Sequence, residues 1–152
     1  MAVVAAILDL LSKRLVFAFL EKIAMTHSIN NPAIEVSSFF NLVYVWNRGV
    51  SFGMFNQIAN AQLVLSALQF SIALILSFWL YNNKKLHITW ALGLIIGGAF
   101  GNLIDRIRNG AVADFLDFHL MTYHWPAFNL ADSFVFIGVM ILIFEDLIIK
   151  KK

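Results

Sequence analysis

Two aspartates, Asp114 and Asp132, are the residues of this chain whose type and position most readily suggest chemistry. Asp114 lies among alanine, valine, phenylalanine and leucine, and Asp132 lies just inside the last long apolar run. A carboxylate at the edge of a membrane segment is expensive to keep, so it is a functional candidate by default. If the two carboxylates converge, they can share one proton and act as an acid/base pair.

Each aspartate also has an ordinary explanation. Asp132 can be an acid at a helix N-terminus, stabilised by the helix dipole and facing water. Asp114 can be a solvated loop carboxylate, and Asp117 is an equal candidate because residues three apart share a face on a helix. The phenylalanines and leucine between and beside these two residues prefer lipid or protein to water, which favours a functional role. Spacing alone does not choose between Asp114 and Asp117.

The composition places these residues in a membrane protein. The chain has 152 residues, of which 61% are hydrophobic and only 13% charged, about half the ~25% usual in soluble domains. The net charge of +2 is too small to indicate a nucleic-acid partner. The absence of cysteine excludes disulfides, thiolate catalysis and zinc–thiolate sites. The four histidines lack metal-binding spacing, so we expect neither a metal nor a cofactor.

Four apolar runs approach or reach the ~20 residues that cross a bilayer. We therefore expect an α-helical membrane protein in which residues 1–152 form a single domain. The expected transmembrane helices cover residues of about 2–20, 61–81, 87–104 and 130–149. The third run carries Gly93, Gly97 and Gly101 at four-residue spacing. Such a small-residue face lets another helix approach its backbone closely.

The lysines predict the orientation of these helices. Lys84 and Lys85 join the second and third runs, and three further lysines end the chain. The positive-inside rule places both groups in the cytoplasm, together with both termini. The outer loops are then about 21–60 and 105–129. Residues 35–46 are rich in β-branched and aromatic types, which predicts a small extracytoplasmic β-sheet element of one or two strands, ending in a turn at 47–49.

In the second outer loop, the residues that predict local structure lie mainly at its two ends. Gly110 follows an arginine and an asparagine, which indicates a turn. Asn129 is a candidate cap for the last helix. Nothing in this loop predicts a strand, and we expect Asp114 to lie in an irregular segment.

Further polar residues lie within or beside the apolar runs. Asp9 and Lys13 are four residues apart in the favourable acid-first order, and the simplest interpretation is that they neutralise each other. Asn102, Asp105 and Arg106 gather at the outer end of the third run. They are either an interfacial stop signal or a support for a catalytic group or lipid phosphate. Asp105 and Arg106 are adjacent, so on a helix they must reach different partners.

Five sequence blocks occur in a fixed order along the chain. They are residues 8–13 (LDLLSK), 47–53 (NRGVSFG), 101–106 (GNLIDR), 112–118 (VADFLDF) and 128–133 (FNLADS). Together they resemble the bacterial lipoprotein signal peptidase family, also called signal peptidase II. One block alone is weak evidence, whereas five in register are highly specific.

The resemblance implies an aspartic endopeptidase of the bacterial inner membrane, a multi-pass protein with its active site near the outer face. It implies cleavage of a prolipoprotein signal peptide before a cysteine that carries a diacylglyceryl group. The catalytic pair carried over from the family is Asp114 and Asp132, not Asp117. The implied substrate-binding or supporting residues are Asn47, Gly49, Asn102, Asp105, Arg106, Asn129, Ala131, Asp9 and Lys13.

The expected partners are the diacylglyceryl-modified prolipoprotein and membrane lipid, with the enzyme a monomer. Two other classes of function stay open at this point. A small transporter or channel component would use Asp9, Asp105, Asp114 and Asp132 as a proton or cation path. A non-catalytic assembly subunit would bind its partner through the glycine face of the third run. A serine-type protease is disfavoured because no serine and histidine have a supporting pattern.

Overall fold

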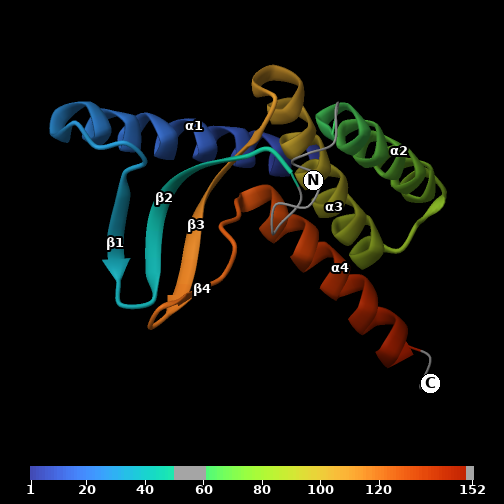
Figure 1. The fold of residues 1–152 in the computed structure, drawn as a ribbon. Helices are drawn as coiled ribbons and strands as arrows, with labels where there is room; N and C mark the ends of the chain where they lie inside the picture. The colour runs from blue at the N-terminus through green and yellow to red at the C-terminus, as the bar shows by residue number, and fades with distance from the viewer. Residues whose placement is uncertain (50–60, 150–152) are drawn as a thin grey trace.

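The computed structural model describes residues 1–49 and 61–149, so the expected block at 50–53 lies outside the described residues. The described chain forms four helices and a four-stranded antiparallel sheet (Figure 1). The elements are α1 (Ala2–His27), β1 (Ala33–Ser37), β2 (Phe40–Asn47), α2 (Ala61–Asn82), α3 (Leu86–Asn109), β3 (Val112–Leu120), β4 (Tyr123–His124) and α4 (Leu130–Ile149).

Helix α3 is the centre of the bundle, because α1, α2 and α4 all pack against it. Its glycines make these approaches possible. A Cβ added at Gly93, Gly97 or Gly101 would meet atoms of α1, and one at Gly98 would meet the carbonyl of Ala131 at the start of α4. The predicted glycine face is therefore confirmed, and its partner is another helix of the same chain. This use of the face removes the main support for an assembly subunit held there.

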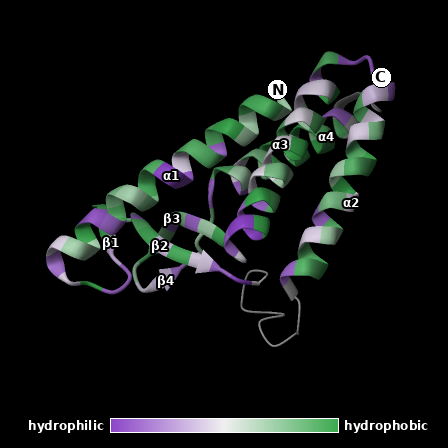
Figure 2. Ribbon diagram, turned by 90° about the horizontal axis from the view of Figure 1, so that it is seen from above, coloured by the Kyte–Doolittle hydropathy of each residue, from purple (hydrophilic) through white to green (hydrophobic). Residues whose placement is uncertain are grey.

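Two of the described helices are long and apolar enough to cross a membrane by length and composition, Gln62–Asn82 and Leu86–Asn109. Hydrophobic residues prevail along the helices in Figure 2. Helix α1 continues to His27 rather than residue 20, and α3 to Asn109 rather than residue 104. Residues 105–109 are therefore the last turn of a helix, while their place relative to the membrane stays a prediction. Helix α3 ends where Gly110 takes a left-handed φ of 65° and its N–H donates to the Arg106 carbonyl.

The sheet combines strands from the two segments expected to form outer loops, in the order β1-β2-β3-β4. Strands β1 and β2 confirm the prediction for the first loop. Strand β3 was not expected, and the prediction of an irregular segment around Asp114 was wrong. Because side chains alternate along a strand, Asp114 and Asp117 point to opposite faces and cannot share one as they would on a helix.

A small apolar core attaches the sheet to the first helix. Phe17 of α1 is buried against Ala113 and Phe115 of β3, and Tyr44 of β2 packs on the same cluster. The rings of Phe17 and Tyr44 lie 4.3 Å apart. Figure 1 shows the strands running across the direction of α1 rather than along it. This packing fixes the middle of β3, which carries Asp114, beside the helix bundle.

Candidate active site

Asp114 is buried in β3 between two amide side chains. Its Oδ1 accepts a hydrogen bond from Asn129 Nδ2 at 2.6 Å, and its Oδ2 accepts one from Asn47 Nδ2 at 2.9 Å. The Asn47 amide is itself held, because its Oδ1 accepts the N–H of Gly49 at 3.0 Å. The structure therefore brings two of the predicted site residues, Asn129 and Asn47, from two separate segments onto Asp114.

Asp132 lies in the first turn of α4, half-buried. Its Oδ1 accepts a hydrogen bond from Asn102 Nδ2 at 2.8 Å. Its backbone N–H donates to Asn129 Oδ1 at 3.1 Å, and its Oδ2 accepts the Asn129 N–H at 3.3 Å. This reciprocal pair is a helix-capping arrangement, which confirms the prediction that Asn129 caps the last helix. Asp132 thus does more than face water at a helix terminus.

Asn129 is the residue that Asp114 and Asp132 share. Its side-chain Nδ2 also lies 3.1 Å from Asn102 Oδ1, so the two asparagines and the two aspartates form one connected network. Asn102 and Asn129 are both buried. The amides leave each carboxylate with hydrogen-bond donors but without a cation in direct contact among the described residues.

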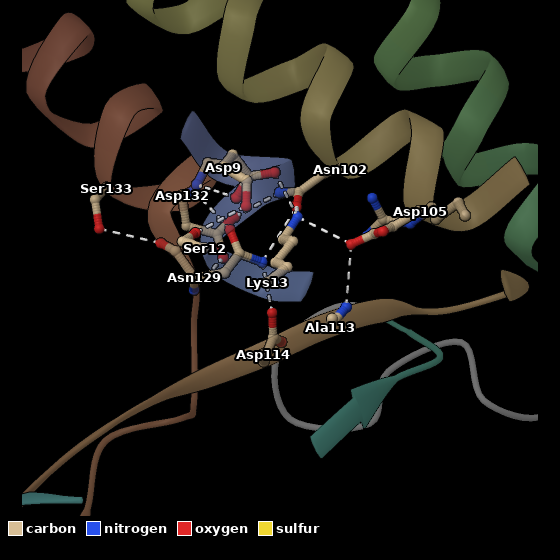
Figure 3. Close-up of polar contacts among 12 residues, drawn as sticks. Asp9, Ser12, Lys13, Asn102, Asp105, Ala113, Asp114, Asn129, Asp132 and Ser133 are labelled. Atoms are coloured by element: carbon tan, nitrogen blue, oxygen red, sulfur yellow. Dashed lines mark hydrogen bonds and ion pairs between the residues drawn. The ribbon is translucent and has the colours of Figure 1, made fainter. Parts of the chain in front are cut away.

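A buried lysine lies behind this network (Figure 3). Lys13 Nζ is 2.7 Å from Asp9 Oδ2 and 3.0 Å from Asp105 Oδ2, and it donates to Asn102 Oδ1 at 2.8 Å. The predicted pairing of Asp9 with Lys13 is confirmed, and Asp105 is a second partner. Gly101 makes room for this cluster, because a Cβ at that position would collide with the Asp9 carboxylate.

The two carboxylates that bind Lys13, those of Asp9 and Asp105, also accept hydrogen bonds from backbone N–H groups. Asp9 Oδ1 accepts the N–H of Ala131 at 2.9 Å, and Asp105 Oδ2 accepts the N–H of Ala113 at 3.3 Å. Ala131 directly precedes Asp132, and Ala113 directly precedes Asp114. One lysine therefore fixes, through two carboxylates, the backbone on which each candidate catalytic aspartate stands.

The surroundings of Asp114 change its acidity. The pKa of Asp114 is raised to about 7, mainly by burial and also by the negative charge of Asp132. The hydrogen bonds from Asn47 and Asn129 and the positive charge of Lys13 act in the opposite direction on this pKa. Near neutral pH the Asp114 carboxyl therefore holds a proton for a large part of the time. A carboxyl that stays protonated beside a second carboxylate has the properties of an acid/base pair.

Arg106 turns away from the hydrogen-bond network toward α2. Its Nη1 donates to Gln69 Oε1 at 2.8 Å, so it meets a different partner from Asp105, as the sequence predicted. The structure gives no direct hydrogen bond from Arg106 to Asp114 or Asp132 in the described part of the chain. Gln69 was not predicted as a site residue. Its signal was an amide in the middle of the second apolar run, where a polar side chain usually faces the bundle interior.

Asp117 belongs to a separate cluster on the other face of β3. His124 Nδ1 lies 2.9 Å from Asp117 Oδ2, and Asn41 Nδ2 donates to the same oxygen at 3.0 Å. The ring of His124 stacks on that of His119 with centroids 4.8 Å apart. Within residues 1–49 and 61–149, no three His, Asp or Glu side chains are grouped as metal ligands.

Comparison with known proteins gives a consistent family. The family model described as signal peptidase (SPase) II matches residues 1–148. A lipoprotein signal peptidase of Aeromonas hydrophila is 40% identical over all of this chain and 89% of its own length. One from Paraburkholderia phytofirmans is 48% identical over 76% of this chain and 68% of its length. One from Anaplasma phagocytophilum is 43% identical over 75% of this chain and 73% of its length.

The fold has solved counterparts as well. Two structures, both titled as a bacterial membrane enzyme, match this chain at 29% and 28% identity. The first has a TM-score of 0.76 and covers 96% of this chain and 84% of its own. The second has a TM-score of 0.78 and covers 97% of this chain and 90% of its own.

Proposed function

Because this chain belongs to the lipoprotein signal peptidase (signal peptidase II) family, we propose that Asp114 and Asp132 are its catalytic pair. The enzyme is an aspartic endopeptidase that removes signal peptides from prolipoproteins. The observation that carries the assignment of the pair is the shared Asn129, which contacts Asp114 and Asp132 at once. A buried Asp114 with a pKa near 7 supports the same assignment.

The proposed mechanism uses one proton shared by two carboxyl groups. Asp132 acts as the base and takes a proton from a water molecule, whose oxygen attacks the scissile carbonyl carbon. Protonated Asp114 donates a hydrogen bond to the carbonyl oxygen as negative charge develops there. When the tetrahedral intermediate collapses, the C–N bond breaks and the leaving amine takes up a proton from the pair. The products are a new carboxylate on the signal peptide and a free amine on the lipoprotein.

Other residues of the network position these groups. Asn129 and Asn102 hold the two carboxylates, and Lys13 holds the backbone beneath them. Asn47, at the end of β2, donates to Asp114, and we assign it a contact with the substrate backbone as well. The Nε of Arg106 on α3 has no hydrogen-bond partner among the described residues, and we assign this side chain to the substrate.

We further propose that all four helices cross the inner membrane, with both termini in the cytoplasm and the sheet on the outer face. The apolar α2 and α3 and the lysines between them support this orientation. Exposed apolar side chains along α1 and α4 support lipid contact for those helices too. The site then lies at the outer bilayer surface, where a diacylglyceryl-modified prolipoprotein reaches it laterally. The glycine face is occupied within the chain, which supports a monomer.

The test is to replace Asp114 and Asp132 separately by asparagine, which keeps the size of the side chain and removes its ionisable carboxyl. Each purified variant is assayed in detergent for cleavage of a diacylglyceryl-modified prolipoprotein. We expect each change to lower the rate by about 10³-fold or more, since acid/base groups typically contribute 10²–10⁴-fold. Thermal unfolding of each variant controls for correct folding. Near-normal cleavage by either folded variant would show that the pair is wrongly assigned.

A further inference from the structure

The free end of the sheet carries a cluster of large apolar side chains. We call it the hairpin tip, defined as the exposed residues Phe39, Phe118, Leu120, Met121, Tyr123 and Trp125. Five of these six, all but Met121, line a shallow hollow of about 330 Å³. Neither residues 36–47 nor residues 118–131 contain an Asp, Glu, Lys or Arg. An uncharged apolar cluster of this kind indicates a surface that meets another apolar phase.

The hairpin tip is held by paired backbone. Leu120 pairs with Tyr123 across β3 and β4, and the Trp125 N–H donates to the Phe118 carbonyl at 2.8 Å. The ring of Phe118 lies 4.8 Å from that of Phe40 on the neighbouring strand. The exposed side chains are therefore presented by a fixed scaffold and are not free to fold back into the protein.

The connections of the hairpin keep it near the bilayer. Only Gly110 and Ala111 separate the end of α3 from β3, and α4 begins at Leu130, shortly after Trp125. Figure 1 shows the strands crossing the direction of α1, with the end of the β3–β4 hairpin pointing away from that helix. In the proposed topology α1 crosses the membrane, so the strands, which run across α1, lie along the membrane surface. Tryptophan and tyrosine combined with aliphatic side chains favour the boundary between headgroups and acyl chains.

We propose that the hairpin tip is an interfacial anchor, with membrane lipid of the outer leaflet as its occupant. This inference concerns the membrane contact and does not depend on the assignment of the catalytic pair. Six residues of continuous strand, about 20 Å, connect Leu120 to Asp114. The depth of the hairpin tip in the leaflet therefore sets the height of the catalytic strand above the lipid.

The absence of cysteine allows a direct test with a matched pair of labels. Met121 in the hairpin tip is 87% exposed, and Met25 near the end of α1 is 81% exposed. Met121→Cys and Met25→Cys are each labelled with the fluorophore NBD, in the full-length protein in lipid nanodiscs. We expect dithionite, a water-soluble reductant, to bleach the label at 121 about fivefold more slowly than the label at 25, because the first is immersed in lipid. Equal rates would overturn the proposal.

Two further measurements separate lipid from other occupants. Protection that appears only when a disc holds more than one chain would identify a second copy as the occupant and would overturn the lipid anchor. The double variant Leu120→Ser/Trp125→Ser is then compared with Met25→Ser for prolipoprotein cleavage. We expect the double variant to lose about fivefold in liposomes and to remain near wild type in detergent, where no bilayer interface exists. An equal loss in both media would assign the residues to the internal structure of the sheet and would contradict the anchor.

Discussion

Strand β3 offers a comparison between two buried aspartates three residues apart. Asp114 and Asp117 are both almost inaccessible to solvent, and each accepts a hydrogen bond from an asparagine on β2. Asn47 donates to Asp114 at 2.9 Å, and Asn41 donates to Asp117 at 3.0 Å. The decisive difference is the second partner. Asp117 is paired with the imidazole of His124, whereas Asp114 has the amide of Asn129 and the charge of Asp132 nearby.

The comparison shows that burial alone does not identify a catalytic carboxyl. Both aspartates are equally removed from water, but only Asp114 lies beside a second carboxylate within a network of neutral amides. In that setting, burial raises the pKa of Asp114 to about 7. Asp117 instead closes the hairpin through His124. The arrangement of partners on each face of one strand thus separates a candidate catalytic role from a structural one.

The largest expected effect comes from making the same Asp→Asn substitution on each of the two faces of β3. Asp114→Asn should lower prolipoprotein cleavage by about 10³-fold, because its shared proton is lost. Asp117→Asn should stay within about threefold of wild type, since an amide still accepts hydrogen bonds from Asn41 and His124. The measurement is the initial rate of prolipoprotein cleavage by each variant in detergent. A loss of comparable size in the two variants would remove the distinction between the faces.

A large effect is also expected from replacing Lys13, which supports the backbone beside Asp114 through Asp105. Among the described residues, Asp117 lacks such a support. Lys13→Met leaves Asp9 and Asp105 buried without their cation, a change that typically costs 3–5 kcal/mol. We expect kcat to fall about 10²-fold and the unfolding temperature to drop as the two backbone anchors loosen. Arg14→Met is the matched control, because Arg14 is adjacent and exposed. Wild-type activity and stability in Lys13→Met would contradict the positioning role.

An effect of intermediate size is expected on the pH profile of cleavage when each of the two asparagines of β2 is replaced. Asp114 is protonated below about pH 7 and ionises above it, so cleavage that needs its proton should decline as pH rises through 7. The Asn47 hydrogen bond lowers the pKa of Asp114, so Asn47→Ala should move this decline upward by about one pH unit. The pH profile of kcat/KM measures the shift. Asn41→Ala, on the other face, should leave the profile in place, and an equal shift in both variants would refute the argument.

The smallest effect on activity is expected from His124. His124→Ala removes the partner of Asp117, and we expect a loss of about 1 kcal/mol in stability, seen as an unfolding temperature a few degrees lower. Cleavage below that temperature should be almost unchanged. His27→Ala, at the exposed end of α1, controls for loss of a surface imidazole. A strong loss of cleavage in His124→Ala alone would connect the hairpin side of β3 to catalysis.

Local patterns in the sequence were sufficient for much of this structure. Apolar run length gave the positions of the helices, four-residue spacing gave the Asp9–Lys13 pair, and the glycines gave the face on which α1 packs. Asn129 was recognisable as a cap from the residues around it. Each of these features depends on neighbours within a few positions, which is why the sequence alone reveals it.

The unpredicted features depend on contacts between distant segments. Strand β3 is buried on both faces over most of its length, so it lacks the polar alternation by which a half-exposed strand is recognised. Its partner β2 lies about 70 positions earlier in the chain. The backbone anchor at Ala131, which Asp9 of α1 makes to the start of α4, and the contact of Gln69 with Arg106 exist only once the helices have packed together. The choice of Asp114 over Asp117 came from the family resemblance, because spacing treats them alike.

The hydrogen bond from Ala131 to Asp9 connects residues 122 positions apart. Its two ends are made at opposite stages of translation. Until the ribosome has added residue 132, the emerging chain holds Asp9, Lys13 and Asp114 but lacks Asp132. A nascent chain that ends before this residue therefore has no complete proposed catalytic pair.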